Sequence, residues 1–405
     1  MKFVHFADSH IDGFKDPRLA DLGLQSFSYV IDYAIKESVD FVLIAGDLFN
    51  TALPRLEALE FVVEQLSQLQ KNNIPIYAIA GSHDASARGK TMIDILALTG
   101  LLINVMQGDI DDNEKLHLKW TIDAKTNAHI TGISGKKGQL DSVFYKQLAP
   151  LQLPENAPTI FLFHGAITQL QPPELATMQS QDIAYLPSGC DYYAGGHVHI
   201  KKSYSDTSHK AVVFPGPTFP NNFSELEKLK TGSFVFYDDT QKQKFSHVPI
   251  PSQPVIVFTV NAQDKTPQQV TQELFDLVTQ NVFEGALVLL RIQGTLLQGT
   301  PSDIDMQQAI QELYSAGAYM VLKNTYALRA HQFEEQESAV AQGASSIEET
   351  IVSQYSKEND TLTLVKEQEK IHQLLNSLAL EPADGEKKTA FVERVIHEIE
   401  AILEK

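Results

Sequence analysis

The sequence predicts an α/β fold, followed by a small second α/β domain and a helical tail. Short apolar runs alternate with helical patterns over the first 250 residues, which is typical of an α/β core. Three prolines between Pro249 and Pro254 interrupt this pattern. Beyond His331 the chain becomes polar, acidic and helical. We therefore predict domains at residues 1–250, 251–330 and 331–405.

The first domain carries five strand-like apolar runs. They lie at residues 3–7, 41–45, 76–80 and 159–163, with the fifth ending at residue 194. Helices are predicted at residues 24–36, 55–71 and 92–98 from the spacing of their apolar residues. Two later runs, at residues 211–214 and 232–237, have no helix between them. We expect both to be antiparallel additions to the core.

The second domain repeats the alternation on a smaller scale. Strands are predicted at residues 255–260, 286–292 and 318–323, with helices at residues 267–279 and 302–316. In the tail, residues 367–380 and 389–403 have helical spacing. The tail helices could serve a partner or simply pack on their own domain.

Composition restricts the class of protein. The chain has 405 residues with 32 basic and 51 acidic side chains, a net charge of -19, so positive charge alone should not bind it to nucleic acid. The single cysteine, Cys190, excludes a disulfide framework and a cysteine-based zinc site. No apolar run is long enough to cross a bilayer, and residues 1–7 lack the pattern of a secretory signal. We expect a reduced cytoplasmic setting and no membrane association.

Five predicted strands end in side chains that can bind a metal. The segments are Asp8-Ser9-His10, Gly46-Asp47, Gly81-Ser82-His83-Asp84, His164-Gly165 and Gly195-Gly196-His197-Val198-His199. In an open α/β sheet the carboxyl ends of the strands face one crevice, which would bring these side chains together. Residues two apart on an extended backbone point to the same side, as Asp8 and His10 would.

The residue types indicate a particular chemistry. Carboxylate and imidazole without thiolate suit Mn, Fe or Zn better than Ca. The ligands suffice for two ions, and Asp47 could bridge them. Two neighbouring ions stabilise the attacking and leaving oxygens of an in-line phosphoryl displacement. His83 followed by Asp84 suits a proton donor held by a carboxylate, although Asp84 could instead be a plain loop cap.

The motif order D-x-H, G-D, G-[N/S]-H-D, H-G, G-H-x-H resembles the calcineurin-like metallophosphoesterases. Within that superfamily the chain resembles the nuclease subunits of the bacterial SbcCD and the archaeal and eukaryotic Mre–Rad double-strand-break repair complexes. The segments that carry the likeness are HFADSHIDG, AGDLFN, AGSHD, GGHVH and FPGPTFPNNFSELEKLKTGSF. The resemblance implies a β-sandwich flanked by helices, a capping domain that binds DNA and a helical tail that binds an ATPase.

The resemblance also implies roles for the motif residues. Asp8, His10, Asp47 and His199 would hold one metal, and Asp47, His164 and His197 the other, with manganese the expected ion. His83 would be the catalytic histidine near the scissile phosphate. Ser82 stands where the family usually has an asparagine that ligates the second metal, so its hydroxyl is a weaker candidate ligand. Asn50 stands where the family often has histidine.

The function expected from this resemblance is Mn-dependent cleavage of DNA. The chain would act as an exonuclease on duplex ends and an endonuclease on single strands. It would do so as a homodimer with an SMC-like coiled-coil ATPase bound to its C-terminal helices. Two alternatives remain open. One is a phosphodiesterase or phosphomonoesterase for small nucleotides, and the other is a DNA-end scaffold whose second metal site is weakened by Ser82.

Overall fold

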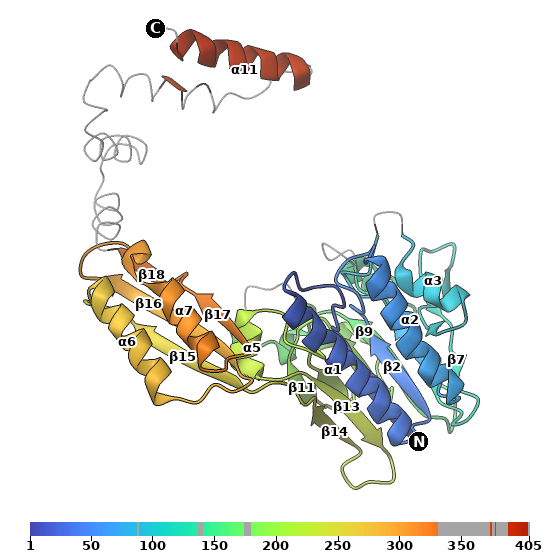
Figure 1. Ribbon diagram of the computed structural model, residues 1–405. Coiled ribbons are helices and arrows are strands. Elements are labelled where there is room, and N and C mark those ends of the chain that lie inside the picture. The colour runs from blue at the N-terminus through green and yellow to red at the C-terminus, as the bar shows by residue number, and fades with distance from the viewer. Residues whose placement is uncertain are drawn as a thin grey trace. The chain divides into compact units, whose positions relative to one another are not determined.

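In this computed structural model the described residues are 1–86, 89–136, 141–173, 180–330, 373–374, 377 and 388–403 (Figure 1). Contacts between residues divide the chain into two compact units. The first comprises Met1–Thr259, Leu277–Arg291 and Gln307–Asn324, and the second comprises the other described residues. The three domains predicted from the sequence stay a prediction.

The first unit contains a six-stranded sheet in the order β14-β13-β1-β2-β3-β4. Its strands are β1 (Lys2–Phe6), β2 (Phe41–Ala45), β3 (Ile76–Ile79), β4 (Ile103–Asn104), β13 (Ser233–Asp238) and β14 (Phe245–Pro249). Strands β1 to β4 run parallel, and β13 pairs antiparallel with both β1 and β14. The run at 232–237 is therefore the antiparallel addition that the sequence predicted.

A second six-stranded sheet has the order β11-β12-β10-β9-β8-β7. Its strands are β7 (Thr121–Ile122), β8 (His129–Ile133), β9 (Thr159–His164), β10 (Tyr192–Gly196), β11 (Lys201–Tyr204) and β12 (Val212–Pro215). The prediction for residues 211–214 was wrong, because β12 runs parallel to β10. The exposed, lysine-bearing β11 takes the edge, pairs antiparallel with β12 and leaves the fully buried β12 as an inner strand.

The alternation of side chains in β1 explains how the layers pack. Phe3 points into a core shared with Ile160 and Leu162 of the second sheet, while Val4 and Phe6 point into a core covered by helices. The helices before residue 250 are α1 (Pro17–Lys36), α2 (Leu56–Lys71), α3 (Met92–Leu98), α4 (Asp141–Gln147) and α5 (Phe223–Leu229). Helices α1 and α2 lie side by side over the first sheet (Figure 1). The predicted sandwich flanked by helices is confirmed.

Short sequence signals set the helix starts. Asp16 caps α1 by accepting a hydrogen bond from the Arg18 N–H, and Pro17 follows at the first helical position. Thr91 and Asp94 form a capping box at α3. Four smaller elements complete the description before residue 250. They are β5 (Gly108–Ile110), β6 (Leu116–Leu118), and the 3₁₀ turns η2 (Thr168–Leu170) and η4 (Ile183–Tyr185).

The chain after residue 250 forms a third sheet, in which β15-β16-β17 are neighbours and β18 pairs with β16. The elements are β15 (Val255–Asn261), α6 (Pro267–Gln280), β16 (Leu287–Leu296), η5 (Pro301–Asp303), α7 (Met306–Ser315), β17 (Met320–Asn324) and β18 (Leu328–Ala330). The three predicted strands and two predicted helices are all present, and β18 is an addition.

In the tail, α11 (Lys388–Leu403) corresponds to the predicted helix at 389–403. Most of the predicted helix at 367–380 lies outside the described residues. None of the helices in the described ranges combines the length and apolar character needed to cross a bilayer.

Candidate metal centre

The candidate ligands lie where strands from two sheets end. Asp8 and His10 follow β1, Asp47 follows β2, and Ser82 and His83 follow β3 in the first sheet. His164 ends β9, and His197 and His199 follow β10 in the second sheet. The crevice is therefore not the edge of one open sheet, as the strand-end argument assumed, but the joint edge of two packed sheets.

Glycine lets the two sheets approach each other at this edge. A Cβ atom added to Gly196 would lie 2.2 Å from the Ala45 carbonyl oxygen and 2.9 Å from His164 Nδ1. A Cβ atom on Gly81 would lie 2.2 Å from the backbone nitrogen of Asp47. The glycines in the G-D, G-S-H-D and G-G-H motifs are thus needed for close contact between ligand-bearing loops.

Three groups of side chains converge at this joint edge. They are Asp8, His10 and His199; His10, Asp47 and His83; and Asp47, His164 and His197. Within each group the potential ligand atoms all lie within 4.8 Å of one another. Ser82 is close as well, with its hydroxyl 3.4 Å from Asp47 Oδ2. Asp47 and His10 each belong to two groups, so the arrangement is one connected cluster.

The backbone at the cluster is strained. Five candidate ligands have a positive φ, a region that non-glycine residues rarely adopt. They are Asp8 (54°), His10 (44°), Asp47 (50°), His197 (102°) and His199 (52°). Such residues cost on the order of 1–3 kcal/mol each and persist where the surrounding structure fixes them, often at functional sites. Strain repeated at the convergence point marks this edge as the functional part of the unit.

Hydrogen bonds orient the imidazole rings. His164 Nδ1 lies 2.8 Å from the carbonyl oxygen of Ala45, and because a carbonyl only accepts, this nitrogen carries the proton. His199 Nδ1 lies 3.0 Å from a carboxylate oxygen of Glu225. The remaining nitrogens face the cluster, where His10 Nε2 and His199 Nε2 are 3.0 Å apart. Metal-binding histidines are held in this way, with the second nitrogen bonded to a carbonyl or carboxylate.

Burial controls the charge states of the cluster. It lowers the pKa of His10 to about 3 and that of His197 to about 4, so both rings are neutral near pH 7. It raises the pKa of Asp8 to about 6. Burial alone would also raise the pKa of Asp47, but His164 and His10 hold it well below its usual range. Neutral imidazoles beside ionised carboxylates are the protonation states that metal binding requires.

The donor set fits divalent cations. Asp8 and Asp47 are 1% and 2% exposed, and buried carboxylates need a compensating positive charge. His164 provides part of it: burial would lower its pKa, yet the charges of Asp47 and Asp8 raise that pKa to about 10. His10 Nδ1 has no hydrogen-bond partner among the described side chains. Cations bound here would supply the missing charge and would leave His164 neutral.

Asp84 and His83 have other hydrogen-bond partners than expected if the Asp84 carboxylate held the His83 ring. The buried Asp84 carboxylate accepts hydrogen bonds from the backbone N–H groups of Gly81 (2.9 Å), Phe49 (3.0 Å) and Leu48 (3.3 Å). His83 Nδ1 instead bonds to the Asn50 carbonyl oxygen at 2.8 Å. These contacts favour the loop cap, which was the alternative interpretation of Asp84. A backbone carbonyl orients His83, so the side chain of residue 50 is not needed for that contact.

Sequence reasoning missed Glu225. This residue lies within the segment FPGPTFPNNFSELEKLKTGSF, which contributed to the resemblance without a role for any of its side chains. Its contact with His199 joins residues 26 positions apart. Asn222 with a glutamate three residues later is a pattern typical of a helix start, and Asn222 is the N-cap of α5. Nothing local indicated which histidine it would contact.

Comparison with known protein families shows which kind of domain the chain contains. Residues 1–201 match the family described as calcineurin-like phosphoesterase. The chain therefore contains a calcineurin-like phosphoesterase domain, and the resemblance in its motifs is confirmed. The matched residues include every candidate ligand named above.

Curated relatives narrow the comparison. The chain is 29% identical over 239 residues to the DNA double-strand break repair protein Mre11 of Archaeoglobus fulgidus, covering 56% of this chain and 52% of that protein. It is 26% identical over 299 residues to the Mre11 of Saccharolobus solfataricus, covering 72% and 74%. It is 28% identical over 236 residues to the uncharacterized metallophosphoesterase YhaO of Bacillus subtilis, covering 56% and 55%. The chain thus spans about half the length of the first and third of these proteins.

Proposed function

We propose that this protein is a metal-dependent DNA nuclease that processes DNA ends in double-strand-break repair. The observation that carries the proposal is the convergence of Asp and His ligands from five strand ends, with His83 at one side of the cluster. The relatives named Mre11, which are DNA double-strand break repair proteins, support DNA as the substrate.

We assign the ligands to two cations, with manganese as the physiological ion. Asp8, His10, Asp47 and His199 hold the first. Asp47, Ser82, His164 and His197 hold the second. When bound, the two cations stabilise the attacking and leaving oxygens of an in-line displacement at phosphorus.

The chain's own residues prepare this reaction in three ways. Asp47 accepts hydrogen bonds from the His83 N–H at 2.7 Å and the Ser82 hydroxyl at 3.4 Å, which ties the loop after β3 to the cluster. The Asn50 carbonyl accepts a hydrogen bond from His83 Nδ1, so Nε2 is the ring atom left to face the substrate. In the doubly protonated ring this Nε2 can donate its proton to the leaving oxygen. The Asp84 carboxylate accepts a hydrogen bond from the Gly81 N–H and so holds the same loop.

The proposal also covers how the protein cleaves DNA and which partners it binds. We assign exonuclease action on duplex ends and endonuclease action on single strands to a homodimer in the cytoplasm, at the nucleoid. Helix α11 exposes Ile396 (48%), with Val395 and Ile399 at helical spacing, and this apolar stripe suits contact with an SMC-like coiled-coil ATPase. A net charge of -19 disfavours tight DNA binding by this chain alone, so the partner would supply further phosphate contacts.

A nuclease assay tests the proposal. The purified chain would be incubated in Mn²⁺ with linear duplex and single-stranded DNA, with and without chelator. The exposed His117, which pairs with Asp111 at 2.9 Å outside the cluster, offers a matched control. We expect cleavage that chelator and His83→Ala abolish and that His117→Ala leaves intact.

Other results would favour the alternatives. Hydrolysis of mononucleotide esters without cleavage of DNA would identify a small-nucleotide phosphoesterase. Binding of one cation per chain with no hydrolysis of either substrate would identify a DNA-end scaffold. Cleavage that persists in chelator or in His83→Ala would contradict the proposed centre.

A further inference from the structure

His199 is a candidate ligand that lies outside the strand preceding it. It lies three residues beyond the end of β10, at a positive φ of 52°, and its side chain is 17% exposed. His164, by contrast, is the last residue of β9, has a fully buried side chain and is held by a backbone carbonyl. The ring of His199 therefore depends on whatever contacts its Nδ1 atom.

That contact is the carboxylate of Glu225 in α5. Glu225 Oε1 lies 3.0 Å from His199 Nδ1. An ionised carboxylate only accepts hydrogen bonds, so the contact places the proton on Nδ1 and leaves Nε2 as the lone-pair donor. That Nε2 lies 3.0 Å from His10 Nε2 and 3.9 Å from Asp8 Oδ1, among the other candidate ligands of one cation.

Glu225 is itself fixed in place by its own loop. Its Oε2 accepts a hydrogen bond from the Asn221 backbone N–H at 2.8 Å, and Oε1 accepts another from the Asn222 side chain at 2.6 Å. The Asn222 side chain in turn accepts a bond from the Glu225 N–H at 3.0 Å and caps the helix. Its two oxygens thus accept from a backbone and a side-chain N–H group, as an ionised carboxylate does.

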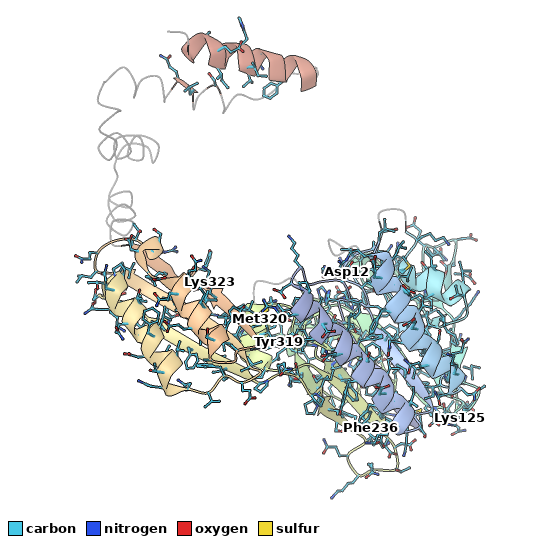
Figure 2. All side chains as sticks on the ribbon, viewed as in Figure 1. Asp12, Lys125, Phe236, Tyr319, Met320 and Lys323 are labelled. Carbon is cyan, nitrogen blue, oxygen red and sulfur yellow. The ribbon has the colours of Figure 1, made fainter. Side chains whose placement is uncertain are left out.

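The two residues after Glu225 anchor the short helix. Leu226 is 1% exposed and belongs to a hydrophobic cluster with Leu19, Leu22, Leu287, Leu289 and Met320. Met320 on β17 is labelled in Figure 2. Glu227 pairs with Arg291 of β16 through both carboxylate oxygens, with Nε at 2.8 Å. Consecutive residues thus hold α5 by apolar packing and by an ion pair, while Glu225 points to the metal centre.

We infer that Glu225 is a positioning residue of the metal centre, which fixes the tautomer and the orientation of His199. The inference rests on the proposed two-cation site and gives a role to the segment after β12 that the sequence comparison left without one. Carboxylates that hold a ligand histidine in this way raise metal affinity by about ten- to one-hundredfold. The effect should fall on the cation that His199 binds and spare the other.

Calorimetric titration of the full chain with Mn²⁺ tests this inference without any turnover. Glu225→Ala removes the acceptor, and Glu225→Gln keeps an acceptor oxygen without the charge. Glu64→Ala, an exposed glutamate on α2, is the matched control. We expect one of the two Mn²⁺ affinities to fall by about ten- to one-hundredfold in Glu225→Ala, with a smaller fall in Glu225→Gln and none in the control. Glu225→Gln also loses one acceptor oxygen of the loop contacts, so thermal unfolding in chelator measures this structural part of the change separately from metal affinity.

The outcomes separate this inference from the proposed function. Unchanged affinities in both Glu225 variants would overturn the positioning role. An equal loss at both cations, together with less stable metal-free protein, would also overturn it, because the glutamate would then be structural. If Glu225→Ala does not fold, Glu225→Gln decides alone. A wild type that binds two Mn²⁺ ions without cutting DNA would refute the nuclease while the calorimetry still decides the role of Glu225. A wild type that binds no Mn²⁺ would refute both.

Discussion

Replacing Asp84 separates a structural role from a catalytic one. The carboxylate is completely buried and accepts three backbone hydrogen bonds, from Leu48, Phe49 and Gly81. These N–H groups belong to the loops that carry Asp47 and His83. If Asp84 is a loop cap, its loss should destabilise the metal-free chain. If it served only the His83 ring, its loss should change activity and leave stability alone.

The size of the effect follows from two opposing terms. A hydrogen bond to a charged group contributes about 1.5–3 kcal/mol, so the three bonds contribute roughly 5–9 kcal/mol. Against this, burial and the nearby Asp47 charge raise the pKa of Asp84 to about 6 even though these bonds favour the ionised form, so part of their contribution is offset. The stabilisation from the hydrogen bonds exceeds the penalty for burying the charge. Asp84→Ala should therefore lower the free energy of unfolding by roughly 2–6 kcal/mol.

Urea unfolding in chelator, followed by circular dichroism, measures this difference. Asp84→Asn keeps the shape and can keep the two bonds to Leu48 and Gly81, so it should lose only about 1–3 kcal/mol. Asp112→Ala, an exposed aspartate, should unfold like the wild type. An Asp84→Ala midpoint equal to that of the wild type, at an unchanged slope, would refute the structural role.

Three further predictions concern the same edge and the core below it. Ser82→Asn should raise the affinity for the second Mn²⁺ by about tenfold in calorimetry, equal to about 1.4 kcal/mol, because an amide oxygen reaches further than a hydroxyl; no change would exclude residue 82 as a ligand position. Gly196→Ala should destabilise the chain by about 1–3 kcal/mol in urea because its Cβ would meet the Ala45 carbonyl oxygen at 2.2 Å. Gly23→Ala in α1, whose nearest neighbour would be 3.9 Å away, should be stabilising by about 0.5–1 kcal/mol, and equal effects of the two changes would contradict this packing. Burial lowers the pKa of His5 from 6.5 to about 3, so only the unfolded chain takes up this proton as the pH falls below 6.5. The free energy of unfolding should therefore fall by about 2 kcal/mol more in the wild type than in His5→Asn between pH 7 and pH 5, and parallel pH curves would show that His5 is not neutral in the fold.

Much of the centre could be predicted because its signals are local. An apolar run that ends in Asp or His indicates a strand, its direction and the chemical type of the group at its end. Those properties need no knowledge of distant residues. They were enough to name Asp8, Asp47, His164 and the other motif residues that the structure brings together. Their roles as ligands stay a prediction until metal binding is measured.

The structure differs from the sequence-based predictions where contacts between residues distant in the chain decide the arrangement. The predicted strands are present, but others were not predicted, among them β8, β11 and β14. Periodicity also does not say which strands become neighbours. The ligand-bearing strands divide between two sheets, and β12 enters beside β10 because the exposed β11 takes the edge. His83 and Asp84 are adjacent in sequence, which favoured a pair, yet their side chains bond to different backbone groups.

The sequence by itself determined the longer helices, the strands that carry the candidate ligands, the family of the first 201 residues and the Asp and His side chains at those strand ends. These depend on short patterns, because backbone direction and side-chain chemistry are local properties. Only the tertiary structure decided that two sheets share the ligand edge, that Asn50 rather than Asp84 orients His83, and that Glu225 holds His199. Those contacts join residues far apart in the chain, and packing and hydrogen-bond satisfaction across the whole unit select them.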